Sequence, residues 1–341
     1  MMKILLLTVL FVLLAGLVNG QNPPIGIIDF YGLRSVSEQH ARQALQMKEG
    51  DSFSGSREEA ERRLEALPNV QQARLDAVCC EGGKAILYVG IKEKGAPSLL
   101  FRSAPKGAIR LPETIIQAGE AFSDALTEGV QKGDVGEDDS RGHTLNSYPK
   151  ARAIQERFIT FAAQDLKLLR AVLYESADAQ HRALAAQITG YAPSKRGVVK
   201  DLLYGMSDPD SVVRNNSMRA LAVIAGFGQQ FPKQQIIVPV KPFIDMLNSI
   251  VWTDLNKSSF ALYQLTEKRD PAVLSELRER ALPSLVEMSR WKSPGHAFRA
   301  FFLLGRVGNL SEREIQKEWD SGNRETLIEK VLKKERTTPD K

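Results

Sequence analysis

The side chains best suited to catalysis or metal binding are few in this sequence and widely spaced. A catalytic or zinc-binding histidine normally has a nucleophile, a carboxylate or a second ligand at a characteristic spacing. None of the histidines stands in such a motif; they are His40, His143, His181 and His296. We therefore expect a protein that is not an enzyme, with no catalytic residue, no cofactor and no metal site.

The two cysteines, Cys79 and Cys80, are adjacent in the chain. Zinc ligands normally lie two or more residues apart, so this pair does not read as a metal site. Two interpretations remain: a strained vicinal disulfide, or two small side chains at the end of a strand. We favour the second.

A short acidic stretch could bind calcium if its spacing were right. Asp134, Glu137, Asp138 and Asp139 lie within the run KGDVGEDDSRGHTLNSYP. The EF-hand pattern requires a glycine for its sharp turn, and Asp139 stands in that place. The run is therefore better explained as a solvated surface loop.

The length and composition of the chain are those of a globular protein that can form more than one domain. The sequence has 341 residues, of which 43% are hydrophobic and 26% are charged. That composition excludes a disordered or fibrous protein and allows two or three domains. The net charge of +5 permits weak binding to anionic surfaces. The basic residues are spread out without interleaved aromatics, so nucleic acid is an unlikely partner.

The first twenty residues read as a secretory signal peptide. Lys3 precedes the apolar run Ile4–Val18, and small residues follow, with cleavage expected after Gly20. The alternative is a membrane anchor, but this run is shorter than the roughly 20 apolar residues that span a bilayer. We expect a periplasmic or otherwise exported protein whose mature chain has no transmembrane segment.

The start and stop signals of helices and strands in residues 24–95 are typical of a small α+β domain. Ile25–Phe30 is a short β-rich run, Ser37 can cap a first helix, and Ser56 with Glu59 has the spacing of a capping box. Pro68 ends the second helix. The order begins as strand, helix, helix.

Two alternating runs complete this domain. Ala73, Leu75 and Ala77 alternate with charged residues, and Ala85–Ile91 alternates again after the turn EGGK. This pattern predicts a β-hairpin. The predicted order of the domain is therefore β-α-α-β-β.

The phrases IDFYGLRSVS, LQMKEGDSFS, RLEALPNVQQARLD and ILYVGIKEK resemble the POTRA domain of outer-membrane assembly, secretion and bacterial division proteins. The resemblance covers about residues 25–95. It implies a small periplasmic binding module without catalytic residues. It also implies a sheet edge, formed by the middle strand in sequence, that can pair with a strand of a protein or peptide partner.

Partner binding is therefore predicted along that strand, which runs from about Val70 to Val78. Its outward or edge positions are Val70, Gln72, Arg74, Asp76 and Val78. An alternative is that Arg74 and Asp76 simply solvate a protected edge.

Residues 96–150 form a connector in this interpretation. The run SLLFRSAPKGAIRL predicts a short hairpin around Pro105–Gly107. Ile115, Gly119 and Phe122 lie at helical spacing, and the acidic loop at 132–149 follows.

Residues 151–335 carry an internal repeat. The tetrapeptide RALA occurs at Arg182–Ala185 and Arg219–Ala222, and related segments follow. Their central alanines are 37, 41 and 39 residues apart, and each segment follows another helical stretch; the alanines are Ala183, Ala220, Ala261 and Ala300. Paired helices at such a period predict an α-solenoid. The alternative is an ordinary helical bundle, and residues 336–341 are expected to be a disordered tail.

One unit, VVKDLLYGMSDPDSVVRNNSMRALAVIAG, resembles a HEAT repeat. Asp208 and Pro209 turn the chain between two helices, and Val213 and Arg214 open the second. The resemblance implies a HEAT-like solenoid with an extended binding surface. The run QQFPKQQIIVPV interrupts the series and predicts a distorted joint.

The RALA helices also suggest a row of basic side chains. If they are equivalent, Arg182, Arg219 and Arg299 point toward one common surface, where Phe260 interrupts the row. These arginines either bind an acidic partner or merely solvate the surface.

The fold expected from the sequence is an α+β domain followed by an all-α solenoid, mostly helical overall. The function expected is that of an exported, non-catalytic interaction scaffold of the bacterial cell envelope, with protein or peptide partners. Two alternatives remain: an envelope enzyme with a site between the acidic loop and the first solenoid helices, or a weak binder of anionic surfaces. The oligomeric state is unknown.

Overall fold

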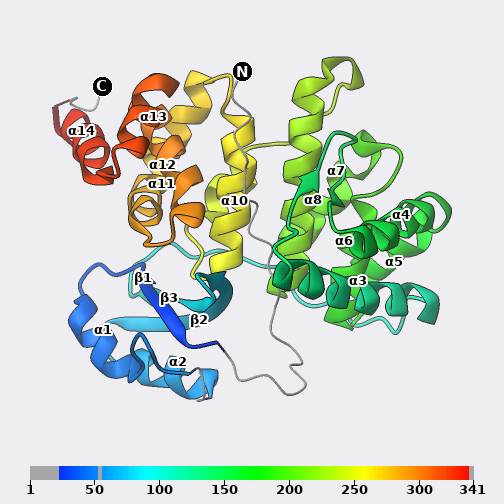
Figure 1. The fold of residues 1–341 in the computed structure, drawn as a ribbon, viewed down its shortest axis with the longest axis horizontal. Helices are drawn as coiled ribbons and strands as arrows, with labels where there is room; N and C mark the ends of the chain where they lie inside the picture. Colours follow the sequence, from blue (N-terminus) through cyan, green and yellow to red (C-terminus); the bar gives the residue numbers. More distant parts are fainter. Residues whose placement is uncertain (1–22, 53–55, 338–341) are drawn as a thin grey trace. The chain divides into compact units, whose positions relative to one another are not determined.

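The computed structural model describes residues 23–52 and 56–337, which form mostly helices and one small three-stranded sheet (Figure 1). The predicted signal peptide, residues 1–20, lies outside the described residues, as do residues 338–341 of the predicted tail.

Two compact units make up the chain. The first, called the α unit here, comprises Leu100–Phe243 and Phe260–Leu265. The second, called the α/β unit, comprises the described residues up to Leu99 together with Ile244–Ser259 and the chain from Thr266 onward. This division differs from the predicted one, in which residues 24–95 stood alone and residues 151–335 were one solenoid.

The sheet of the α/β unit has the predicted element order. Strand β1 (Ile25–Tyr31) precedes helices α1 (Glu38–Leu45) and α2 (Arg57–Glu65), and the hairpin of β2 (Val70–Glu81) and β3 (Lys84–Glu93) follows. Strand β3 is central, parallel to β1 and antiparallel to β2. Strand β2 therefore lies at an edge of the sheet, as predicted.

Both helices of this domain begin where the sequence predicted. The side chain of Ser37 accepts a hydrogen bond from the amide of His40 at the start of α1. Ser56 accepts one from the amide of Glu59 at the start of α2. Each cap satisfies one of the free N–H groups of a helix N-terminus.

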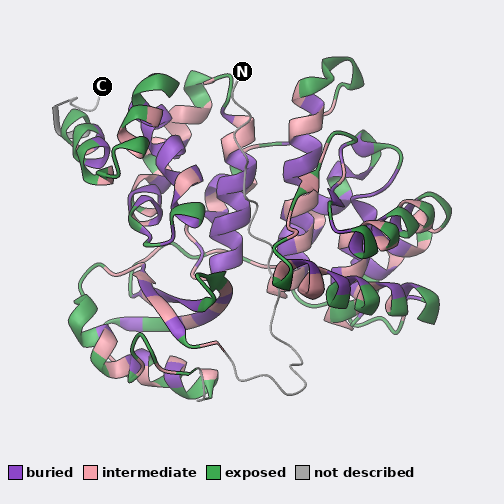
Figure 2. Ribbon diagram, in the orientation of Figure 1, coloured by how far each residue is buried: buried purple, intermediate pink, exposed green. Residues whose placement is uncertain are grey.

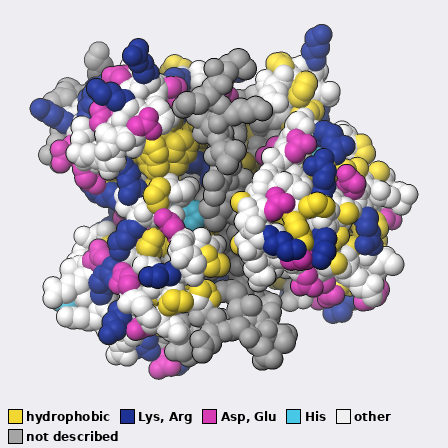
Figure 3. Space-filling model, viewed as in Figure 1, with side chains coloured by type: hydrophobic (Ala, Val, Ile, Leu, Met, Phe, Trp, Pro, Cys, Tyr) yellow, Lys and Arg dark blue, Asp and Glu magenta, His cyan; other side chains and the backbone are white. Residues whose placement is uncertain are grey.

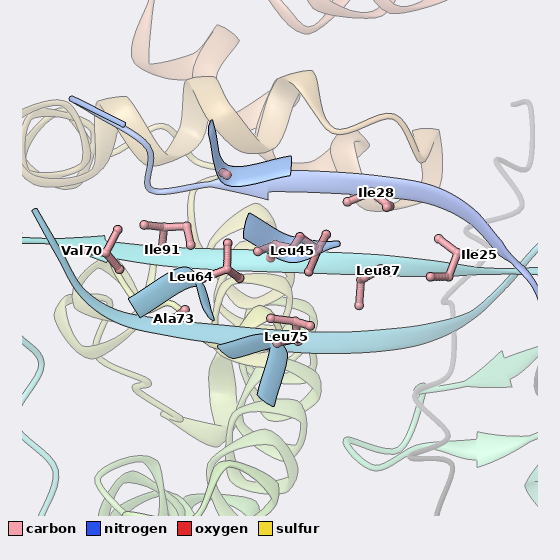
Figure 4. Packing of buried hydrophobic residues seen from close by; sticks show 12 residues of the cluster. Ile25, Ile28, Leu45, Leu64, Val70, Ala73, Leu75, Leu87 and Ile91 are labelled. Atoms are coloured by element: carbon pink, nitrogen blue, oxygen red, sulfur yellow. The ribbon is translucent and has the colours of Figure 1, made fainter. Parts of the chain in front are cut away.

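One face of the sheet packs on α1 and α2 (Figure 4). Apolar side chains at alternate positions of the strands meet the apolar stripes of both helices. Twelve buried residues form this core: Ile25, Ile28, Ala41, Leu45, Ala60, Leu64, Val70, Ala73, Leu75, Leu87, Val89 and Ile91.

The opposite face of the sheet is also covered, which the sequence interpretation did not include. Tyr88 on β3 stacks on Trp252 with ring centroids 5.1 Å apart, and it packs on Trp291 at 4.9 Å. The Tyr88 hydroxyl lies 2.7 Å from Nδ1 of His296, and the hydroxyl of Tyr31 donates to the Ile250 carbonyl. These aromatic contacts tie the sheet to the C-terminal part of the chain and explain why residues 24–95 are not a separate unit.

Helices complete the α/β unit. Helices α11 and α12 pack together, and α13 and α14 pack on them. Their bounds are Pro271–Arg290 for α11, Pro294–Val307 for α12, Glu312–Asp320 for α13 and Arg324–Thr337 for α14. The division between the two units falls within α9 (Lys241–Met246) and α10 (Trp252–Leu265).

The α unit is a helical repeat solenoid. Helix α5 packs on α6, α6 on α8 and α7 on α8, and α6 and α8 contain the two RALA segments. The interior sides of these helices are buried (Figure 2). The helices are α3 (Glu113–Gln131), α4 (Pro149–Gln164), α5 (Leu166–Glu175), α6 (Ala179–Thr189), α7 (Lys195–Met206) and α8 (Ser211–Gln230). The interrupting run QQFPKQQIIVPV begins with the last two residues of α8 and then contains only the short 3₁₀ helix Pro232–Gln234.

The hairpin predicted around Pro105–Gly107 is absent. Gly107 instead pairs with the chain between α5 and α6: its amide donates to the Glu175 carbonyl, and its carbonyl accepts from the amide of Ala177. Backbone groups that a hairpin would have paired locally are thus satisfied by a segment about seventy residues later.

The acidic loop is ordered by contacts with helices. It contains a two-stranded ladder of β4 (Glu137–Asp138) and β5 (Leu145–Asn146). The amide of Asn146 donates to the Gln155 side chain, and the Tyr191 hydroxyl donates to the Thr144 carbonyl. The acidic part, residues 131–141, is exposed or half-buried as predicted for a solvated loop, whereas the following residues 144–146 are buried.

Cys79 and Cys80 form a disulfide, against the interpretation that we favoured. They lie where the register of β2 against β3 shifts, between Val78 and Glu81.

Across the described ranges, every helix is either too short or too polar to serve as a membrane span.

Candidate interaction sites

The predicted partner strand β2 is an edge strand, but its side chains are less exposed than expected. Gln72 is exposed and Arg74 is half-buried, whereas Val70, Asp76 and Val78 are buried. Asp76 therefore does not solvate the edge.

Asp76 faces the second side of the sheet. One carboxylate oxygen accepts a 2.9 Å hydrogen bond from the Trp252 amide, and the other lies 3.4 Å from a guanidinium nitrogen of Arg57. Burial raises the pKa of Asp76, against the opposing effect of these two partners. The main partner is 176 positions away in the sequence, so the local alternation of β2 could not reveal it.

Two glutamates of α2 occupy part of the free edge of β2. A carboxylate oxygen of Glu65 accepts the Ala73 amide at 3.0 Å, and one of Glu61 accepts the Leu75 amide at 2.8 Å. Arg57 holds Glu61 in place through a 3.0 Å ion pair. The sequence interpretation missed these caps, although Glu61 and Glu65 are one helical turn apart on the same side of α2.

The caps show which backbone groups face away from the sheet. In an antiparallel ladder, the N–H and C=O of one residue point to the same side, and successive residues alternate. The amides of Ala73 and Leu75 point outward, so that of Arg74 points toward β3. The carbonyls of Ala73, Leu75 and Ala77, and the Ala77 amide, have no partner on this side among the described residues. Three carbonyl groups and one amide of this edge are therefore available for pairing with another strand.

The predicted arginine row is not an exposed surface. Arg182 is only 1% exposed and binds Asp208 through two hydrogen bonds of 2.9 Å. Its third nitrogen donates to the carbonyls of Ser176 and Ala177, which lie in the turn between α5 and α6. Four of its five N–H groups thus hold two helices and the turn between them.

Arg214 repeats this arrangement in the next unit. It donates to the carbonyls of Asp208 and Pro209, as Arg182 does to those of Ser176 and Ala177. Each arginine lies four residues after an aspartate that caps its helix, Asp178 in α6 and Asp210 in α8. Arg182 is therefore equivalent to Arg214, 32 residues later, and not to Arg219.

The other two members of the row also differ from the expectation. Arg219 forms an ion pair with Glu137 of the acidic loop, whose side chain is 5% exposed. Arg299 is 6% exposed and belongs to the α/β unit. Phe260, which was expected to interrupt the row, is buried. Three arginines at one sequence period thus have three different environments.

A buried amine lies where the sequence left room for an alternative site, between the acidic loop and the helices. Lys195 Nζ donates to the Gly190 carbonyl at 2.9 Å and lies 3.0 Å from Nδ1 of His143. Burial lowers the pKa of Lys195 to about 7, and burial with the Lys195 charge lowers the pKa of His143 to about 4. Both contacts of the amine are to protein acceptors, so the pair holds the loop against α7.

Charges on the molecular surface are mixed. In Figure 3 lysines and arginines alternate with acidic side chains over the face shown, without one large basic area. This distribution gives no support to binding of an anionic surface on that face.

No protein-family model and no curated protein matches the chain. Two similar solved structures are designed armadillo repeat proteins. The first, in complex with the peptide (KR)4, has a TM-score of 0.35 and 12% identity, and covers 55% of this chain and 93% of its own. The second has a TM-score of 0.33 and 13% identity, and covers 60% of this chain and 92% of its own. Similarity at this level carries no argument about function.

Proposed function

We propose that this chain is an exported, non-catalytic interaction scaffold of the bacterial cell envelope, which binds an extended segment of a protein or peptide along β2. The observation that carries the proposal is the row of outward carbonyls at Ala73, Leu75 and Ala77 on an edge strand. An added strand satisfies such groups with its own amides, which is β-augmentation. In this proposal the domain is POTRA-like and the helical repeats are HEAT-like.

The glutamates of α2 set the length of the added strand. Glu61 and Glu65 already accept the amides of Leu75 and Ala73, so a partner must displace them to pair fully. At Ala77 the amide is free outside the sheet, and pairing there has no competitor among the described residues. We therefore expect pairing to begin near Ala77 and to extend toward Ala73 only if both carboxylates move away.

The central test is a substitution that removes the outward donor at Ala77. Proline at Arg74 is unsuitable because the Arg74 amide points toward β3, so proline there would break the ladder within the sheet. Ala77→Pro removes an outward donor, and Ala77→Val keeps that donor and is the matched control. Full-length mature protein carrying each variant is used to capture partners from envelope extract, after circular dichroism has shown that it is folded.

The expected result is at least tenfold lower capture by the proline variant and near-normal capture by the valine variant. A photo-crosslinking residue at exposed Glu81, at the unblocked end of β2, then locates the contact, with one at exposed Gln117 on α3 as control. Crosslinks to a polypeptide from Glu81 but not from Gln117 support the edge. Equal capture by both folded Ala77 variants, or crosslinking only from Gln117, would reject it.

Export is a separate part of the proposal, supported by the signal-like Lys3 and Ile4–Val18 run. Expression of the full precursor followed by fractionation should yield an envelope protein whose first residue is Gln21. Recovery of the intact Met1 terminus from the cytosol would contradict export and leave the test of the β2 edge unaffected.

A further inference from the structure

The α/β unit contains a cavity of about 170 Å³ beside the end of the sheet. A single water needs only about 10–15 Å³ of such volume, so there is room for a larger group. Four segments line it: the loop after β1, the chain from β3 onward, the residues before α10 and one side of α11. The lining residues used below are Gly32, Arg34, Lys92, Asn248, Ser249, Ser284 and Glu287.

Glu287 of α11 supplies a carboxylate to this cavity. One of its oxygens accepts the Gly32 amide at 3.0 Å. No lysine or arginine of the described chain lies within ion-pair distance of it, and its other oxygen has no hydrogen-bond partner there. Burial raises the pKa of Glu287, against the hydrogen bond from the Gly32 amide and the more distant charges of Arg34 and Arg290. Glu287 is half-buried, and a carboxylate that is partly removed from water gains stability when a proton or a cation joins it.

The serine, asparagine and lysine side chains of the lining are already paired with protein groups, whereas the exposed Arg34 acts on Glu287 only from a distance. The Ser249 hydroxyl donates to Asp254, and the Ser284 hydroxyl donates to the amide oxygen of Asn248. The Lys92 ammonium donates to Ser98. Among these lining side chains, Glu287 is the strong acceptor that remains available.

Polar and apolar groups contribute about equally to the wall, and its apolar part suits a short alkyl chain. Its apolar members are Tyr31, Leu33, Ile91, Ala96, Pro97, Leu247, Ile250, Leu255 and Pro283. Methylene groups pack on such surfaces while a terminal charge reaches a polar partner. Apolar surface beside a few oriented polar groups is the usual composition of a small-molecule or side-chain pocket.

We propose that this cavity binds an alkylammonium or alkylguanidinium group, with Glu287 as its counter-ion. The group is either a lysine or arginine side chain of a peptide or a free small amine. The proposal is independent of the β2 edge, because neither Ala77 nor the caps of α2 line the cavity.

The test uses the full mature chain labelled with ¹⁵N and four probes. Butylammonium and butylguanidinium chloride supply the cation, n-butanol is the neutral control, and the blocked peptide acetyl-Gly-Arg-Gly-amide carries the same group on a backbone. Binding is followed by the shift of the Gly32 amide resonance. Saturable binding of the cations in the millimolar range is expected, with butanol at least tenfold weaker.

Two variants assign the binding to Glu287. Glu287→Gln keeps a carbonyl oxygen for the Gly32 amide, so it should fold, and it should weaken cation binding at least tenfold. Glu276→Gln, on the same helix but outside the cavity, should leave binding unchanged. Arg34→Gln should strengthen binding, because it removes a like charge from the wall.

The peptide distinguishes the two sources of the cation. Tighter binding of the peptide than of butylguanidinium assigns the cavity to a side chain, and equal or weaker binding assigns it to a free amine. Unchanged affinity in folded Glu287→Gln, butanol binding as well as butylammonium, or no saturable shift with either cation would overturn the proposal.

Discussion

The guanidinium of Arg182 and the carboxylate of Asp208 form a two-pronged ion pair in which the side chains are 2% and 0% exposed. Arg102 shares the same carboxylate. Removal of one partner from a buried pair leaves an uncompensated charge, and this costs more than the intact pair contributes. Asp208 therefore fixes the joint between the two best-defined repeats.

We predict that Asp208→Asn destabilises the protein by about 3–5 kcal/mol. Urea denaturation of full-length protein measures this change. The control is Glu325→Gln, which removes a pair with Arg290 whose side chains are both about half exposed. Its expected cost is less than about 1 kcal/mol. Similar costs for the two variants would mean that the Asp208 pair is not a structural joint.

The buried amine of Lys195 should give the protein a pH-dependent stability. Its pKa is about 7 in the folded protein, against 10.5 for an ordinary lysine. Between these values the unfolded chain binds more protons than the folded one, so stability should rise as pH increases from 7 toward 10.5. One such group contributes a slope of up to about 1.4 kcal/mol per pH unit.

Lys195→Met removes the titrating group, so its stability profile should lack that slope. Denaturant melts of both proteins at several pH values give the difference directly. The absolute stability of the variant is not the test, because it also loses the hydrogen bond to the Gly190 carbonyl. Parallel profiles for the two proteins would contradict the low pKa of Lys195.

Ala220 of α8 lies close against the end of α6. A Cβ built on Gly190 would be 2.7 Å from the Cβ of Ala220, so the contact accepts only small groups. Ala220→Leu should therefore overpack it and cost about 1–3 kcal/mol. Ala163→Leu, at an exposed position of α4, is the control and should stay within about 0.5 kcal/mol of wild type. A neutral Ala220→Leu would show that the two helices do not pack closely at this point.

Gly90 of β3 allows close approach of the chain that covers the second face of the sheet. An added Cβ would lie 2.2 Å from the Ile250 carbonyl oxygen and 2.8 Å from the ring of Tyr31. Gly90→Ala should therefore destabilise the α/β unit by more than the roughly 1–3 kcal/mol typical of an overpacked core.

The control is Gly226→Ala in α8, where the nearest atom to an added Cβ is 3.8 Å away. Alanine is favoured over glycine inside a helix by about 0.5–1 kcal/mol, so this variant should be neutral or stabilised. Thermal melts of both variants provide the comparison. A stable Gly90→Ala protein would show that the sheet face is less tightly covered than described.

Local signals in the sequence predicted much of the fold because their physical causes are local. Ser37 and Ser56 cap helices through amides three residues later, and the Asp208–Pro209 turn separates two helices. Alternation placed Leu75 in the core, whereas the edge position of β2 was implied only by the resemblance to the POTRA domain. Each of these features depends on residues within one or two turns of chain.

The failures involve partners that are distant in the sequence. The alternating pattern of β2 predicts a solvated side chain at Asp76. In the structure Asp76 is buried and accepts a hydrogen bond from the Trp252 amide. The same is true of Gly107, which pairs with residues 175–177 instead of forming a hairpin. One signal was available: the nearly continuous apolar run Ala85–Gly90 is typical of a strand that is buried on both faces.

The candidate site was predicted in position more than in detail. The edge strand is present, but the caps by Glu61 and Glu65 leave only part of it open. The arginine row was predicted from a tetrapeptide of common residues. In the structural repeat, however, Arg182 is equivalent to Arg214. The ion pairs that bury Arg182 could not be read from its period alone.

The hydroxyl contact between Tyr88 and His296 joins residues 208 positions apart. During synthesis, strand β3 with Tyr88 is completed long before Trp291 and His296 are made. This face of the sheet therefore stays exposed to solvent until the C-terminal part of the chain is available. Contacts of such long range slow folding, because a large loop must close before they form. The α/β unit therefore cannot close until nearly the whole chain is available, and under the proposed export this delay would keep the precursor unfolded for transport.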